Sequence, residues 1–152
     1  MDAEIVDRPA GWVLGIGARI VPGQADYKGL WEGQFMPRHD EIKRLAVDQA
    51  YYGVYYPCDE PGKADFIAGM ATGEGIQMPE GLVKRPLPSG SYALFRCTMA
   101  SMAATWGSIY REWLPTSVYL EDETRPAFEY YPPEMTGPES EVTIFVAVKP
   151  KE

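Results

Sequence analysis

One carboxylate stands in the middle of an aromatic stretch near the C-terminus of this chain. The stretch Ala127-Phe128-Glu129-Tyr130-Tyr131 has the aromatic content of a β-strand. Because alternate side chains of a strand face opposite sides, Glu129 shares a face with Ala127 and Tyr131. Two alternatives follow. Glu129 points to water from a half-exposed strand, or it is held in an aromatic environment, where a carboxylate marks a functional site.

Other kinds of reactive site have little support in the sequence. His39 is the sole histidine and lies in the polar stretch Pro-Arg-His-Asp-Glu, which we expect to be exposed. Zinc sites and nucleophiles that need a histidine base are therefore set aside, and no metal or cofactor is expected. Cys58 and Cys97 are well separated and lack Cys-x-x-Cys spacing. This pattern is typical of free thiols in a reducing cytoplasm.

The bulk properties narrow the class of protein further. The chain has 152 residues, of which 45% are hydrophobic and 24% charged, as in one globular domain or two small halves that share a core. A net charge of −8 without any basic run argues against direct nucleic-acid binding. The N-terminus lacks the features of a signal peptide, and the apolar segments are too short to span a bilayer. We therefore predict a cytoplasmic protein without membrane contact.

The elements that position Glu129 recur along the chain. Residues 5–9, Ile-Val-Asp-Arg-Pro, return as Leu-Val-Lys-Arg-Pro at 82–86, each before a strand-like run, a Trp-bearing helical segment and two further strands. This offset of about 75 residues indicates a duplicated supersecondary unit. We predict a single α+β domain of residues 1–152, with repeat one at about 4–72 and repeat two at about 81–149. The strand–helix–strand–strand units pair across a pseudo-twofold axis, with antiparallel sheets and a groove between the halves.

Individual elements follow from hydrophobic periodicity and turn residues. Pro115 is expected to end the second helix, because proline removes a donor and disfavours helix just before it. The segment Met36 to Val47 is interpreted as an insertion with a short helix through 41–45, and the last strand, apolar on both faces, is expected to be covered on both. The predicted strands are 12–20, 51–57, 64–72, 91–97, 128–131 and 141–148, and the predicted helices are 24–35 and 99–113.

At this level of detail the chain resembles the GyrI-like effector-binding domain family. This family is the small-molecule-binding module of AraC-type and MerR-type regulators, and it also occurs as a free-standing protein. The resemblance covers nearly the whole chain, because the first half carries the family's Leu30-Trp31 helix and paired strands. Three segments carry it most specifically: Trp106…Ile109-Tyr110…Trp113-Leu114-Pro115, Pro126-Ala127-Phe128-Glu129-Tyr130-Tyr131 and Val142-Thr143-Ile144-Phe145-Val146-Ala147-Val148-Lys149.

The resemblance implies a central groove that binds hydrophobic, planar or cationic compounds. In multidrug-binding members a glutamate on the penultimate strand lies at the base of the pocket among tyrosines. Glu129 matches this position, so the resemblance favours a functional carboxylate over a surface one. Met36, Met99 and Met102 are interpreted as adaptable core residues. The other candidate ligand-binding side chains are Tyr131, Trp106, Tyr110, Tyr55, Tyr52, Phe66, Trp31 and Met70.

Three classes of function stay open, with small-molecule binding favoured. The alternative is a hydrolase that opens the cyclopropane ring of DNA-alkylating natural products, in which Glu129 positions or deprotonates a water and Tyr110 or Tyr55 is the hydroxyl donor. The third is a protein inhibitor like the family's gyrase inhibitor, whose negative charge mimics nucleic acid. The chain leaves no room for a helix-turn-helix beside the domain, so we expect the free-standing form. The sequence leaves open whether it is a monomer or a homodimer and whether it has a protein partner.

Overall fold

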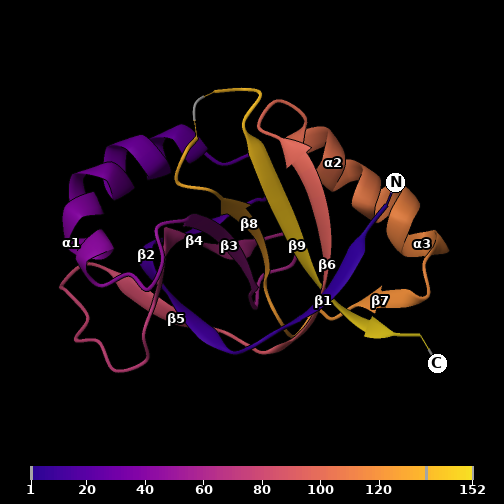
Figure 1. Cartoon of the computed structure of the whole chain (residues 1–152), viewed down its shortest axis with the longest axis horizontal. Coiled ribbons are helices and arrows are strands. Elements are labelled where there is room, and N and C mark those ends of the chain that lie inside the picture. The colour runs from indigo at the N-terminus through magenta and orange to yellow at the C-terminus, as the bar shows by residue number, and fades with distance from the viewer. Residues whose placement is uncertain (1, 136, 152) are drawn as a thin grey trace.

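A single antiparallel sheet organises the computed structural model, which describes residues 2–135 and 137–151. Residues 1 and 152 of the predicted domain therefore lie outside the described part. The strands are β1 Glu4–Arg8, β2 Gly11–Ile20, β3 Tyr51–Pro57, β4 Ala64–Thr72, β5 Val83–Leu87, β6 Gly90–Thr98, β7 Tyr119–Glu121, β8 Ala127–Tyr131 and β9 Glu141–Pro150. Figure 1 shows the two helical segments above this sheet, one beside each half.

The order of the strands shows the predicted duplication. It runs β1-β6-β9-β8-β3-β4-β2-β5, with β7 added beside β9, and every pairing is antiparallel. The order is symmetric about the contact between β8 and β3. The α+β fold with pseudo-twofold symmetry is therefore confirmed. The two halves also exchange their short strands, because β1 pairs with β6 and β5 pairs with β2.

These exchanged strands are the two copies of the repeated sequence that begins each half. The repeat was predicted from the sequence, but its two copies were not predicted to be strands, and each copy ends in Arg-Pro. Proline lacks the N–H that an interior strand needs, but it is tolerated on an edge strand. Pro86 lies in β5, which forms one edge of the sheet.

Both helical segments extend beyond their predicted C-terminal ends. The first does not stop at Phe35 but continues through the segment 36–47 as far as Arg44, so that segment lengthens the helix rather than forming a separate insertion. The second includes Pro115, which stands in the first turn of α3, where a missing N–H is tolerated. The segments are η1 Gly29–Phe35, η2 Met36–Arg38 and α1 His39–Arg44 in the first half, and α2 Met102–Ser108, η3 Ile109–Trp113 and α3 Leu114–Thr116 in the second.

Three hydrophobic clusters stabilise the fold, two between the helical layer and the sheet and one on the opposite face of the sheet. In the first half Leu30, Phe35 and Ile42 of the helical segment pack on β2 and β4. In the second half Ile109 packs with residues of β6 and β9. The third cluster covers the opposite face of the sheet and includes Tyr52. No helix in the described part of the chain is long and apolar enough to cross a membrane.

The pairing of β8 fixes which way Glu129 points. The strand lies between β3 and β9, with Glu129 opposite Gly53 on one side and opposite Ile144 on the other.

The last strand, β9, is buried on both faces. One face buries Val142, Ile144, Val146 and Val148, and the other buries Phe145 and Ala147. The prediction that both faces of the last strand are covered is therefore confirmed.

Candidate ligand-binding site

A cavity of about 1040 Å³ lies where the two helical segments diverge above β3 and β8. Its walls are mainly aromatic rings and methionine side chains. The charged side chains among its lining residues are Glu129, Lys28 and Glu32. Lys28 and Glu32 belong to exposed residues of the first helical segment, whereas only 3% of Glu129 is exposed. The cavity therefore has a buried acid at its base and two long, exposed charged side chains at its rim.

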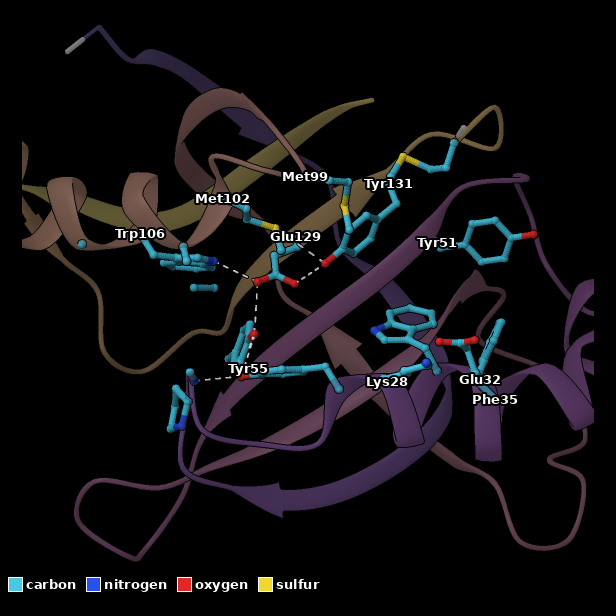
Figure 2. A pocket seen from close by; sticks show the side chains of 18 of the residues that line it. Lys28, Glu32, Phe35, Tyr51, Tyr55, Met99, Met102, Trp106, Glu129 and Tyr131 are labelled. Carbon is cyan, nitrogen blue, oxygen red and sulfur yellow. Dashed lines mark hydrogen bonds between the residues drawn. The ribbon is translucent and has the colours of Figure 1, made fainter. Parts of the chain in front are cut away.

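Three neutral donors hold the Glu129 carboxylate. Tyr131 donates its hydroxyl to Oε1 at 2.5 Å, while Tyr55 and the indole N–H of Trp106 donate to Oε2 at 3.0 and 2.8 Å. Figure 2 shows Trp106 and Tyr55 on one side of the carboxylate and Tyr131 on the other. Tyr27 extends the network, since its hydroxyl lies 3.2 Å from that of Tyr55. The carboxylate is thus fixed in position without a cation.

The electrostatic consequence is an acid that resists ionisation. Burial raises the pKa of Glu129, and the hydrogen bonds from Tyr131, Trp106 and Tyr55, which favour the carboxylate, offset only part of this effect. Among the described residues, no lysine, arginine or histidine forms an ion pair with Glu129. Burial also raises the pKa of Tyr55 and Tyr131, and the negative charge of Glu129 adds to both shifts. Both tyrosines therefore stay protonated as donors.

A glycine on the neighbouring strand leaves room for this carboxylate. Gly53 pairs directly with Glu129 across the β3–β8 contact. A Cβ atom at position 53 would lie 3.0 Å from Glu129 Oε1 and 3.2 Å from the ring of Phe66. Both neighbours are buried, so neither moves away freely. Gly53 is needed here for space, because its φ is not in the left-handed region.

Most of the predicted site residues meet at this cavity, and three do not. Tyr52, Phe66 and Met70 are not among the residues that line it. Tyr52 points to the opposite face of the sheet, where its hydroxyl donates to Asp48 at 2.8 Å. Phe66 and Met70 are core residues under the first helical segment. The structure places the others on the cavity wall: Glu129, Tyr131, Trp106, Tyr110, Tyr55 and Trp31.

Tyr110 has a different polar partner from the one the hydrolase alternative requires. Its ring stacks on Trp106 with 6.3 Å between centroids, but its hydroxyl donates to Glu121 at 2.7 Å. Burial raises the pKa of Glu121 and of Tyr110. Glu121 does not line the cavity. The hydroxyls that contact Glu129 belong to Tyr55 and Tyr131 instead.

Several residues that line the cavity were not predicted from the sequence. Tyr27 and Phe35 lie four residues on either side of Trp31 and line the cavity, so the helical i, i+4 spacing was the available signal. Tyr51 also lines the cavity, and its hydroxyl lies 2.9 Å from His39 Nε2. His39 is therefore half-buried rather than exposed as predicted, with 18% of its side chain accessible.

The prediction was also wrong for two of the three methionines. Met36, Met99 and Met102 line the cavity together with Met135, and Met36 and Met99 are 51% and 38% exposed. Met36 and Met99 are therefore not core residues, whereas Met102 also packs against the hydrophobic cluster of the second half, as predicted. Thioether side chains are flexible and polarizable, which suits a wall that adapts to ligands of different shape. Within residues 2–135 and 137–151, no cluster of His, Cys, Asp and Glu side chains is arranged to hold a metal ion.

Comparison with known proteins agrees with this fold. The sequence pattern of the family described as the GyrI-like small molecule binding domain matches residues 1–149. The chain belongs to this family. The predicted resemblance is thus confirmed, and with it the general role of a small-molecule-binding domain.

Three known proteins are similar to this chain, one in sequence and two in structure. The transcriptional regulator BrlR of Pseudomonas aeruginosa is 32% identical over 155 residues, which cover 97% of this chain but only 56% of the regulator. The structure of SAV2435 bound to tetraphenylphosphonium is similar with a TM-score of 0.75 and 16% identity, over 98% of this chain and 94% of that one. A hydrolase from Listeria innocua is similar with a TM-score of 0.58 and 12% identity, over 97% and 91%. The last two likenesses show a shared fold.

Proposed function

We propose that this protein binds hydrophobic cations in its aromatic cavity, with Glu129 as their counter-ion. The observation that carries the proposal is a buried carboxylate held by three neutral donors and paired with no basic side chain in the described part of the chain. Burial removes water from the charged form of the acid, and a ligand cation beside it restores the lost interaction. Tetraphenylphosphonium bound to SAV2435 is a ligand of this chemical class.

The aromatic wall makes such a site broad in selectivity. A cation above an aromatic face gains about 0.5–2 kcal/mol, and the ring does not demand one hydrogen-bond pattern. Trp31, Trp106, Tyr55 and Tyr131 all lie on this wall. One fixed charge and several ring faces therefore recognise charge and hydrophobicity rather than one chemical structure. The flexible methionines at the mouth support the same conclusion.

Binding is favoured over hydrolysis because the carboxylate is already engaged. A carboxylate has about four lone-pair sites, and three donors occupy positions on Glu129. About one site is thus left for the water that a general base needs within hydrogen-bond reach, and the carboxylate is already held by its three donors. Of the two hydroxyl donors that the hydrolase alternative names, Tyr110 is bonded to Glu121, whereas Tyr55 contacts Glu129. The protein-inhibitor alternative has no comparable support from the site.

Isothermal titration calorimetry with two ions of one shape tests the proposal. Tetraphenylphosphonium and tetraphenylborate have nearly the same size and opposite charge. We expect the wild-type protein to bind the cation and to reject the anion. Glu129→Gln should weaken cation binding by at least about thirtyfold, because leaving a buried charge without its partner costs about 2–5 kcal/mol.

Glu121→Gln is the matched control. Glu121 is also a carboxylate with a tyrosine partner and a pKa raised by burial, but it lies outside the cavity wall. Cation affinity should be unchanged in this variant. Equal affinity of the wild-type protein for both ions would contradict the proposal. Ring-opened product from a cyclopropane-bearing alkylator, formed by wild type and lost in Glu129→Gln, would replace it with the hydrolase alternative.

A further inference from the structure

The wall of the cavity is built from two matching sets of side chains. On the helical segments Tyr27, Trp31 and Phe35 lie 75 residues before Met102, Trp106 and Tyr110. All six line the cavity. On the two central strands, Tyr55 and Tyr131 are 76 residues apart and also line the cavity. Each half of the fold therefore supplies a tryptophan, a second ring, and a strand tyrosine in corresponding places.

The contacts within these sets correspond as well, and they cross between the halves. Tyr131 meets Trp31 of the other half with ring centroids 5.8 Å apart and an angle of 73°. Tyr55 meets Trp106 of the other half at 5.7 Å and 78°. Two Tyr–Trp corners of nearly the same geometry thus stand on the cavity wall. Both corners adjoin Glu129, because each tyrosine donates to one of its two carboxylate oxygens.

A second ring extends each corner along its helix. Phe35 lies edge-on to Trp31 at 5.1 Å and 68°, whereas Tyr110 is stacked on Trp106 at 6.3 Å and 8°. Each strand tyrosine also touches the matching residue of its own half, since Tyr55 is hydrogen bonded to Tyr27 and the Tyr131 hydroxyl lies 3.7 Å from the sulfur of Met102. The main break in the correspondence is the acid itself. Glu129 is opposed by Gly53, 76 positions earlier.

We infer that the cavity contains two equivalent aromatic subsites that flank one charge. Its preferred ligands are cations whose positive centre lies between two aromatic arms. This inference rests on the proposed function, since it uses Glu129 as the counter-ion. It adds that a single-armed cation binds in either of two orientations, with its ring in one corner or in the other. The duplicated fold provides the two corners, and the unduplicated acid provides the centre between them.

Two small cations and two substitutions test this. Benzyltrimethylammonium has one aromatic arm, and dibenzyldimethylammonium has two arms and the same charge. Trp31→Leu removes a ring from one corner, and Tyr110→Leu removes the ring beside the other corner; neither side chain bonds to Glu129. Trp31→Phe and Tyr110→Phe are conservative controls that keep a ring and report on folding. Affinities are measured by titration calorimetry.

The two-armed cation should lose up to about tenfold in affinity in each leucine variant, because an aromatic pair contributes about 0.5–1.5 kcal/mol beyond its buried area. The one-armed cation should lose only about twofold in either variant, because it moves to the remaining corner, and it should lose up to about tenfold in the double variant. Both phenylalanine variants should stay close to wild type. This pattern is specific to two equivalent subsites.

Other outcomes separate the two proposals. If one leucine variant weakens both cations strongly and the other weakens neither, the cavity has one aromatic subsite and the inference is wrong. The same holds if dibenzyldimethylammonium binds wild type no more tightly than benzyltrimethylammonium. Glu129→Gln should weaken both cations in either case. If it weakens neither, the counter-ion role of Glu129 fails, and the proposed function fails with it.

Discussion

The two central strands, β3 and β8, are related by the pseudo-twofold axis of the sheet, yet only one of them carries a charge into the cavity. Gly53 of β3 and Glu129 of β8 lie directly opposite each other. The tyrosine two residues after each, Tyr55 or Tyr131, donates a hydrogen bond to the same carboxylate. The duplicated scaffold therefore supplies a symmetric aromatic wall, and the unequal pair Gly53 and Glu129 places a single charge within it.

The difference also explains why the first half has no side chain at this position. Two acids facing each other in a buried site would repel, and one would be forced to hold its proton. Even a methyl group at position 53 would crowd Glu129 and Phe66. The site thus depends on a residue that contributes only space.

Gly53→Ala should have the largest effect. Overpacking a buried position costs about 1–3 kcal/mol of unfolding free energy, and the added methyl group should displace the Glu129 carboxylate and weaken tetraphenylphosphonium binding. Gly11→Ala is the control, because a Cβ there meets no atom within 4 Å. It should leave affinity unchanged and stabilise slightly, since alanine loses less backbone entropy than glycine. Urea unfolding and calorimetry measure both effects, and an equal response of the two variants would exclude a steric role for Gly53.

Substituting the strand tyrosines, Tyr131 and Tyr55, should have the next largest effects on cation affinity, and the two effects should differ. Tyr131→Phe removes the one donor to Oε1 among the described residues, whereas Tyr55→Phe leaves Oε2 with its bond from Trp106. Either change raises the pKa of Glu129 further, because it removes a bond that favours the carboxylate. At pH 5 we expect Tyr131→Phe to weaken tetraphenylphosphonium binding by about tenfold, since a hydrogen bond to a charged group contributes about 1.5–3 kcal/mol. Tyr55→Phe should have a smaller effect, and the reverse order would contradict this account of the network.

Substituting the tryptophans, Trp106 and Trp31, should have the smallest effects on cation affinity. Trp106→Phe keeps a ring but removes the indole N–H that bonds to Glu129, whereas Trp31 makes no such bond. At pH 5 we expect Trp106→Phe to weaken cation binding by about threefold to tenfold, because it removes one hydrogen bond to the carboxylate. Trp31→Phe should change it by less than about twofold. The same titration measures both variants, and matching losses would mean that the indole N–H has no special role.

Much of the fold followed from local sequence patterns. The strands 51–57 and 64–72 have the predicted bounds, because clear turn residues delimit them. The C-terminal ends of the helical segments were not predicted correctly. Each segment passes through a π-helical turn and continues into a further helix that has a proline in its first turn. The exchange of β1 and β5 between the halves was also beyond the sequence, because pairing between distant edge strands leaves no local signal.

The site was predictable where one residue type was unusual and less so where many were alike. Glu129 stood out as an acid among aromatics, and alternation correctly placed Tyr131 on its face. Alternation along 51–57 should also have separated Tyr52 from Tyr55, but with tyrosines on both faces the pattern did not indicate which face was the cavity. The role of Gly53 depends on the β3–β8 register, which only the assembled sheet reveals.

The most direct test of the central claim is the affinity for tetraphenylphosphonium as a function of pH. The free protein holds the pKa of Glu129 above its ordinary value of 4.5 because the side chain is buried. A bound cation stabilises the carboxylate, so binding must release a proton wherever free Glu129 is protonated. Affinity should therefore rise with pH above 4.5 and become level once the pH exceeds the raised pKa of the free protein.

Calorimetry from pH 5 to pH 8, with wild type and Glu129→Gln in parallel, measures this. The account predicts rising affinity for wild type, with proton release at the lower pH values, and a weak, level profile for the variant. Profiles that coincide for the two proteins would show that Glu129 is not the counter-ion of the bound cation.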